Sequence, residues 1–261
     1  MGKLIINALN QLALHLDRSK GYVQATATEL VLHLAGPEEL SRFTGEAYDR
    51  NPNYLDGSKQ YLFDWEEAIV AEFFPPAPSK ILVGACGGGR EMVGLAKLGY
   101  SVEGFDPGAA LVSLARKQVP TERLLELAVG SYEDLIIGSA SVCAHGPYDA
   151  LILGWGSLSH LAAAKTRHEL LLRARELCPR GPIVLSWVHD GPGEPALAIR
   201  KWLAALGFAT RDVRECYTMI GGYSRSYSHE EIFSLAANTG HRVLRYDEGD
   251  YPHAVLAAAL A

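Results

Sequence analysis

At 261 residues and 48% apolar, the chain is long enough to bury one large α/β core with a small accessory layer. Its formal net charge of −6, without a run of basic residues, argues against a nucleic-acid partner on electrostatic grounds, so none is expected. The four cysteines stand far apart, so neither a zinc site nor a disulfide framework is expected. The nine histidines include no H-E-x-x-H motif and no pair flanked by carboxylates, so no metal site is expected from them either. Neither a long apolar run nor a signal-peptide pattern occurs, which predicts a cytoplasmic protein with no membrane partner.

Residues 1–75 precede the repeating pattern of strands and helices. Helices are expected over 4–16 and 27–33, and a proline cluster at 75–79 marks the end of this segment. The stretch 43–65 carries several aromatic side chains among polar residues and glycines. These side chains are equally suited to cover a ligand and to pack the helices onto a sheet.

Residues 80–107 contain the most informative pattern in the chain. An apolar strand over 81–83 runs directly into a glycine-rich turn at 84–89, so no large side chain separates this backbone from a ligand. A helix follows the turn, and its N-terminus points at the expected ligand site. The next strand, 100–105, leads to Asp106, whose carboxylate can accept hydrogen bonds from two ribose hydroxyls. The pattern indicates a cofactor that contains a nucleoside.

The spacing of the glycines discriminates between cofactors. A dinucleotide fingerprint counted from Gly87 and Gly89 would place its third glycine at Met92. The lysine and hydroxyl pair of a phosphate-binding P-loop is absent from residues 84–94. Both nucleotide-phosphate motifs are therefore disfavoured.

The segment resembles the first motif of the class I S-adenosylmethionine-dependent methyltransferases, whose loop is commonly acidic-x-Gly-x-Gly-x-Gly. Val83 stands where that family usually has an acid, and Ala85 replaces the first glycine. The two later glycines and Asp106 are in register with the motif. The resemblance implies S-adenosylmethionine as cofactor and S-adenosylhomocysteine as product.

Later segments follow the order of strands and helices in that family. Further strands are expected over 124–129, 148–154, 182–188, 242–246 and 254–259, and helices over 109–118, 162–177, 195–206 and 229–239. The resemblance implies a seven-stranded, mostly parallel Rossmann-like sheet with helices on both faces, formed by residues 76–261 and closed by an antiparallel pair. Residues 1–75 would form an N-terminal helical cap. Residues from about 190 to 227 exceed the family core and are expected to form an insertion after strand five, over the mouth of the site.

The resemblance also implies which residues hold the cofactor. Asp106 would bind the ribose, the glycine loop would approach the methionine end, and the corner after the third strand would hold the adenine. The residues expected to contact the cofactor are Gly84, Ala85, Cys86, Gly87, Gly89, Asp106, Pro107, Ser131, Tyr132, Glu133, Gly154 and Trp155.

Methyl transfer is an in-line displacement in which the cofactor supplies the reactivity. A base is needed only where the acceptor arrives protonated, and His160 and His189, just past strands four and five, are the candidates. Tyr223 in the insertion is the third catalytic candidate. The residues expected to contact the acceptor are Tyr48, Tyr54, Trp155 and Tyr223, although Trp155 would serve equally to pack under the following helix.

The acceptor is expected to be a small molecule or short peptide, methylated on oxygen or nitrogen. The sequence LGWGS after strand four lacks the Asp/Asn-Pro-Pro-Tyr/Phe motif of enzymes that methylate adenine or glutamine, and the Pro-Cys pair of cytosine C5 methyltransferases is absent. Two alternatives remain: a non-catalytic subunit that keeps the cofactor fold, and an oxidoreductase that uses a nicotinamide cofactor. The oligomeric state is open, with a homodimer among the options.

Overall fold

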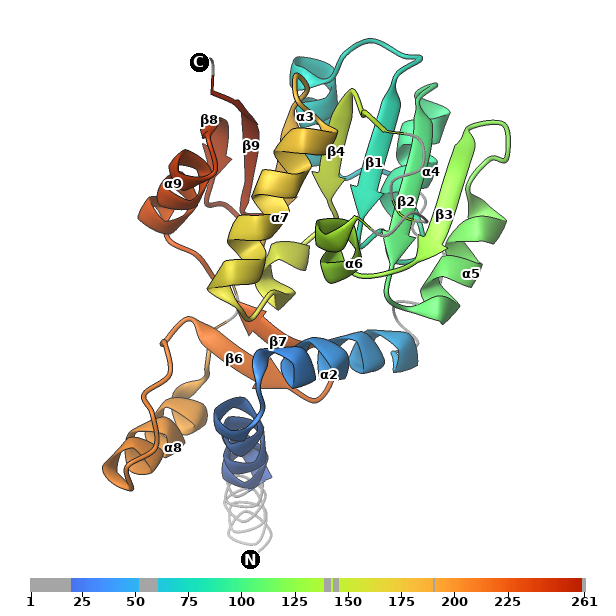
Figure 1. Ribbon diagram of the computed structural model, residues 1–261. Helices are drawn as coiled ribbons and strands as arrows, with labels where there is room; N and C mark the ends of the chain where they lie inside the picture. Colours follow the sequence, from blue (N-terminus) through green and yellow to red (C-terminus); the bar gives the residue numbers. More distant parts are fainter. Residues whose placement is uncertain (1–19, 52–60, 139–141, 143–145, 190, 260–261) are drawn as a thin grey trace, which may run out of the picture.

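A computed structural model describes residues 20–51, 61–138, 142, 146–189 and 191–259 (Figure 1). The expected helix over 4–16 and the candidate residue Tyr54 lie outside these ranges. In the described part of the chain, no helix is long and apolar enough to cross a membrane, and no group of three or more His, Cys, Asp or Glu side chains is placed to hold a metal ion.

The centre of the molecule is a seven-stranded sheet in the order β3-β2-β1-β4-β5-β9-β8. Its strands are β1 (Lys80–Gly84), β2 (Ser101–Asp106), β3 (Leu124–Val129), β4 (Ala150–Leu153), β5 (Ile183–Ser186), β8 (His241–Asp247) and β9 (His253–Ala258). The first five pair in parallel, whereas β9 runs antiparallel to both β5 and β8. The expected sheet and its antiparallel closing pair are confirmed. The strand order reverses between β1 and β4, and in such sheets ligands bind at the carboxyl ends of the strands at that point.

Helices cover both faces of the sheet because successive residues of its buried strands point to opposite sides. Leu82 packs in a core with residues of α6, α7 and α9, whereas Ile81 and Val83 pack in a second core with residues of α3, α4 and α5. The bounds are α3 (Asp64–Phe73), α4 (Arg90–Lys97), α5 (Ala109–Gln118), α6 (Tyr132–Ile137), α7 (Ala164–Leu177) and α9 (His229–Asn238). The expected helices in the core match these to within two residues, while α3 and α6 were not expected.

The N-terminal segment and the insertion after β5 pack together across the carboxyl end of the sheet (Figure 1). The parts are helical residues 20–34, α2 (Pro37–Arg50), α8 (Glu194–Ala205) and the hairpin β6 (Glu215–Thr218) with β7 (Gly222–Arg225). Arg200 of α8 forms a buried ion pair with Glu29, with 2.7 Å between Nη2 and Oε1. The N–H of Tyr223 in β7 donates to Thr44 Oγ1 of α2 at 2.9 Å. These contacts hold the N-terminal segment, including α2, against the insertion.

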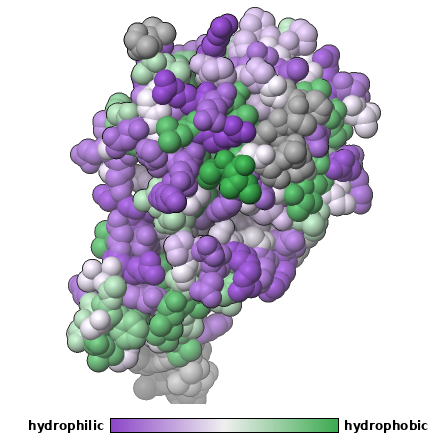
Figure 2. Space-filling view, in the orientation of Figure 1, coloured by the Kyte–Doolittle hydropathy of each residue, from purple (hydrophilic) through white to green (hydrophobic). Residues whose placement is uncertain are grey.

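Hydrophobic side chains gather on the surface of α8 and helical residues 20–34, at the lower end of the view in Figure 2. The exposed side chains there include Val23, Leu34, Trp202 and Leu206. None of them lines the cavity that lies at the carboxyl ends of the strands.

Candidate active site

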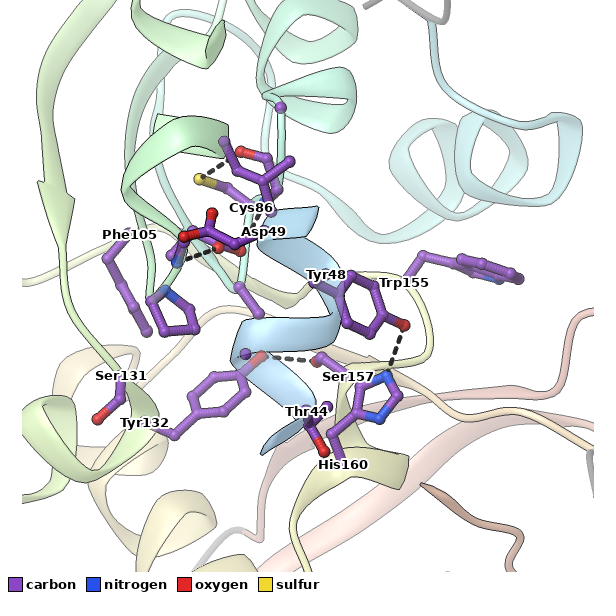
Figure 3. Close-up of a pocket in the computed structure, with 18 of the residues that line it drawn as sticks. Thr44, Tyr48, Asp49, Cys86, Phe105, Ser131, Tyr132, Trp155, Ser157 and His160 are labelled. Atoms are coloured by element: carbon purple, nitrogen blue, oxygen red, sulfur yellow. Dashed lines mark hydrogen bonds between the residues drawn. The ribbon is translucent and has the colours of Figure 1, made fainter. Parts of the chain in front are cut away.

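A cavity of about 810 Å³ lies between α2 and the carboxyl ends of β1, β2 and β4 (Figure 3). This volume is in the range of ligand pockets. Its wall includes most of the residues expected to contact the cofactor: Ala85, Cys86, Gly87, Asp106, Pro107, Ser131, Tyr132, Glu133 and Trp155. Three of the expected residues do not line the cavity and instead pack closely against other parts of the fold: Gly84, Gly89 and Gly154.

The glycines of the loop have different roles. A side chain on Gly87, at φ +54°, would meet nothing within 4 Å, so a ligand has room to approach this backbone. A Cβ on Gly84 would instead lie 2.8 Å from the Tyr132 ring and 2.9 Å from the Phe105 ring, and one on Gly89 would lie 2.9 Å from Ala115 Cβ. Gly84 and Gly89 therefore permit close packing inside the fold.

Ala85 keeps the backbone conformation that favours glycine. Its φ is +48°, in the left-handed region, and it is the one described residue other than glycine with a positive φ. Such a conformation costs a non-glycine residue roughly 1 kcal/mol or more, and it persists where the surroundings impose it. Here the Cys86 N–H donates to the carbonyl of Phe105 in β2 at 3.0 Å, which holds the loop. The loop keeps its shape despite the departure from the glycine motif.

Asp106 lies at the end of β2 and ties two turns together. Its Oδ2 accepts from the Gly87 N–H and its Oδ1 from the Gly108 N–H, both at 2.8 Å. The pKa of Asp106 is raised to about 6, chiefly by burial and to a smaller extent by the neighbouring Asp49 carboxylate, while these two hydrogen bonds lower it. An ionised carboxylate has about four acceptor sites, so Asp106 can still accept hydrogen bonds from a ligand.

The corner after β3 is formed by the start of α6. Ser131 caps this helix: its Oγ accepts from the Asp134 N–H at 3.2 Å, and its own N–H donates to Asp134 Oδ2 at 2.8 Å. Tyr132 is buried, and its hydroxyl lies 2.6 Å from Ser157 Oγ. Tyr132 therefore forms part of the cavity wall, while the polar groups of Ser131 are engaged within the turn.

Tyr48 of α2 and His160, just after β4, form a hydrogen-bonded pair in the cavity (Figure 3). The Tyr48 hydroxyl lies 2.8 Å from His160 Nε2, and His160 Nδ1 lies 2.7 Å from the carbonyl oxygen of Tyr223. A carbonyl oxygen only accepts, so Nδ1 carries the proton and Nε2 accepts from Tyr48. Burial lowers the pKa of His160, which keeps the ring uncharged and able to take a proton.

The other two catalytic candidates lie outside this cavity. The Tyr223 ring is fully buried, and its hydroxyl donates to Glu215 Oε1 at 3.1 Å, so only its backbone carbonyl contacts His160. His189 Nε2 lies 2.7 and 2.9 Å from the carbonyl oxygens of Glu248 and Gly249, and these contacts hold the ring outside the cavity. Of the three candidates, His160 is the one whose side chain lines the cavity.

Comparison with protein-family models and with curated proteins finds no match. Several solved structures do have similar folds. One is a 1,6-didemethyltoxoflavin-N1-methyltransferase from Burkholderia thailandensis with bound 1,6-didemethyltoxoflavin and S-adenosylhomocysteine, at TM-score 0.57 and 16% identity, covering 85% of this chain and 89% of that chain. Another is a SAM-dependent methyltransferase from Methanosarcina mazei, at TM-score 0.55 and 16% identity, covering 77% of this chain and 100% of that chain. A third is the CcbJ methyltransferase from Streptomyces caelestis, at TM-score 0.53 and 17% identity, covering 75% of this chain and 88% of that chain.

The chain has the class I S-adenosylmethionine-dependent methyltransferase fold. Within that fold, α4 begins with a buried charged cluster beside the loop. Arg90 binds both carboxylate oxygens of Glu66, at 2.6 and 2.7 Å, and Glu91 Oε1 at 2.8 Å. Glu91 Oε1 also accepts from the Trp155 N–H at 3.2 Å. The cluster therefore connects the loop after β1 to the segment after β4.

The rim of the cavity in this methyltransferase fold is aromatic. Phe63 lies under the Arg90 guanidinium, whose central carbon is 3.9 Å from the ring centroid. The Trp155 ring, 42% exposed, contacts Phe63 edge-on, and Tyr251 stacks on Phe63 with centroids 5.4 Å apart. Trp155 is thus a wall at the rim, and its half-exposed ring does not pack under the following helix.

Several cavity residues were not expected from the sequence, because α2 itself was not. The segment Gly36–Pro37–Glu38–Glu39 was an available signal for the start of this helix: Pro37 occupies the first turn and Glu39 closes the cap. No local pattern indicates that Asp49, at the other end of α2, would reach the end of β2.

Proposed function

We propose that the chain is an S-adenosylmethionine-dependent methyltransferase that transfers the methyl group to an oxygen or nitrogen of a small molecule or short peptide. The observation that carries this is one cavity with both parts of such a site: a nucleoside-binding edge at Gly87 and Asp106, and the Tyr48–His160 pair. The fold neighbour described with bound 1,6-didemethyltoxoflavin and S-adenosylhomocysteine supports a small-molecule acceptor.

The residues present fit this cofactor. Gly87 leaves room for a ligand against the loop, and Asp106 faces the cavity with acceptor sites to spare for ribose hydroxyls. When bound, S-adenosylmethionine supplies an electrophilic methyl group on sulfur. The chain itself has to orient the acceptor, exclude water and, where the acceptor arrives protonated, remove one proton.

The Tyr48–His160 pair provides a path for that proton. As the acceptor oxygen or nitrogen forms its bond to the methyl group, its proton passes to the Tyr48 oxygen, and Tyr48 gives its own proton to His160 Nε2. The Nδ1 hydrogen bond to the Tyr223 carbonyl then stabilises the imidazolium. Tyr48 would contact the acceptor, and His160 would store the proton.

We expect His160→Gln and Tyr48→Phe each to lower kcat by roughly 100-fold, the scale of losing a general base, while the affinity for S-adenosylhomocysteine stays unchanged. Turnover is measured with an acceptor found by screening, and cofactor affinity by calorimetry. His189→Gln is the matched control, because this histidine lies outside the cavity, and it should keep wild-type turnover. Wild-type kcat across pH in the His160→Gln variant would remove the base assignment.

The affinity for S-adenosylhomocysteine should depend on pH through Asp106. The ribose hydroxyls donate to the charged carboxylate, and because its pKa without ligand is about 6, protons compete below that pH. We expect affinity to fall about tenfold between pH 7 and pH 5. Calorimetry over this range tests the expectation, and Asp106→Asn, which does not titrate, should give a flat profile. A wild-type profile that is equally flat would contradict it.

Neither alternative function has a specific observation in its favour. In place of the third glycine of a dinucleotide fingerprint, Met92 is buried against Gly104, whose added Cβ would lie 2.6 Å from Met92 Sδ. The glycine that permits close packing of α4 on β2 thus lies on the strand. In the dinucleotide fingerprint, the glycine that permits close helix–strand packing lies on the helix. A non-catalytic subunit would not require the hydrogen-bonded Tyr48–His160 pair that lines the cavity.

A further inference from the structure

The last turn of α2 brings a second carboxylate to the place where Asp106 lies. Asp49 lines the cavity, and Figure 3 shows its side chain beside the loop that carries Cys86. A methyl group placed on Gly108 would lie 2.7 Å from Asp49 Oδ1 and 3.1 Å from Asp106 Oδ1. The two oxygens can be no farther apart than the sum of these distances. A carboxylate from the N-terminal segment therefore lies close to one from the sheet, and both line the same cavity.

The Asp49 carboxylate has a buried oxygen that no group in the described part of the chain binds by a hydrogen bond. Its Oδ1 is shielded from solvent and has no hydrogen-bond partner there. The charge of Asp49 also raises the pKa of Asp106, which means that the two carboxylates repel each other. In addition, Asp49 stands next to the last residue of α2, where a negative charge opposes the helix dipole. Asp49 therefore contributes no evident stability to the fold without a ligand.

A buried carboxylate oxygen without a partner needs a hydrogen-bond donor. The vicinal hydroxyls of a ribose offer two donors on neighbouring carbons, which suits two acceptors on either side of the group. A metal ion would require more ligands, and the described residues contain no group of three or more candidate side chains. The chemistry of this corner therefore favours a sugar diol.

We propose that Asp49 accepts a hydrogen bond from one ribose hydroxyl of the cofactor, so that the diol is held between Asp49 and Asp106. The inference rests on the proposed function, because the cofactor supplies the ribose. Its consequence is that α2 is joined to the sheet through the ligand. Cofactor binding then fixes the wall of the acceptor site, since Tyr48 precedes Asp49 on the same helix.

The test is calorimetric binding of S-adenosylhomocysteine and of its 2′-deoxy and 3′-deoxy analogues, with a metal chelator present throughout. Asp49→Ala should weaken binding of S-adenosylhomocysteine by about tenfold, the scale of one hydrogen bond to a charged group. For the analogue that lacks the hydroxyl bound by Asp49, wild type and variant should bind equally. Asp64→Ala is the matched control, because this exposed aspartate on α3 lies outside the cavity, and it should leave all three affinities unchanged.

Thermal unfolding of the ligand-free variants separates a binding role from a structural one. Because Asp49 has no stabilising partner, Asp49→Ala should unfold at the wild-type temperature or above it. A lower Tm, an equal loss of affinity for all three ligands, or no loss at all would overturn the assignment of Asp49 and leave the cofactor assignment intact. Failure of the wild-type protein to bind S-adenosylhomocysteine would overturn both.

Discussion

Replacing Asp106 by alanine is expected to weaken the binding of S-adenosylhomocysteine roughly 30-fold, or about 2 kcal/mol. The variant loses the acceptor for the ribose hydroxyls. It also loses the hydrogen bonds from the N–H groups of Gly87 and Gly108, which hold the two turns that flank the ligand. The affinity is measured by calorimetry at pH 8, where the wild-type carboxylate, with its pKa of about 6, is ionised.

The matched control for this variant is Asp149→Ala. Asp149 also accepts from a backbone N–H of the sheet, that of Lys80 at 2.8 Å, but it lies at the amino end of β1, away from the cavity. The control should bind with wild-type affinity. Unchanged affinity in Asp106→Ala itself would show that the ribose does not bind there.

Gly154→Ala is expected to abolish binding of S-adenosylhomocysteine and to lower the free energy of unfolding by roughly 3 kcal/mol, the upper range for overpacking a core. The added methyl group would overlap the Ala85 carbonyl oxygen and would lie 2.8 Å from that of Gly84. Both contacts are with backbone, so the loop itself would have to move. The hydrogen bond from the Gly154 N–H to the Gly84 carbonyl, 2.7 Å, would be distorted as well.

Urea unfolding and calorimetry measure the two effects of Gly154→Ala separately. Gly191→Ala is the control, because a methyl group at that loop position meets nothing within 4 Å, and it should change neither quantity. Wild-type stability together with wild-type affinity in Gly154→Ala would mean that the close approach of β4 to the loop is not needed.

The parts of this molecule that the sequence predicts well are those with local signals. The strand, glycine turn, helix and acid over residues 80–107 have the expected order, and the helix expected over 229–239 begins at a capping box formed by Ser228 and Glu231. Each of these depends on residues close together in the chain. Local periodicity was therefore sufficient for the strands and for most of the helices beside them, whereas α3 and α6 were missed.

The parts that were missed depend on contacts between distant residues. Tyr48 and His160 were each singled out, but their pairing joins positions 112 residues apart and was not expected. Gly84 and Gly89 were assigned to the ligand because a sequence does not show which side of a loop a glycine faces. The direction of the Tyr223 ring was missed as well, because it depends on the hydrogen bond of its hydroxyl to Glu215 and is not visible in the sequence. The cytoplasmic location and the homodimer remain predictions.

Calorimetric titration of the purified protein with S-adenosylhomocysteine, with NAD titrated in parallel, decides whether this cavity is a methyltransferase cofactor site. We expect binding of S-adenosylhomocysteine in the micromolar range and no binding of NAD. Binding of NAD alone, or of neither ligand, would contradict the assignment of the loop and of Asp106.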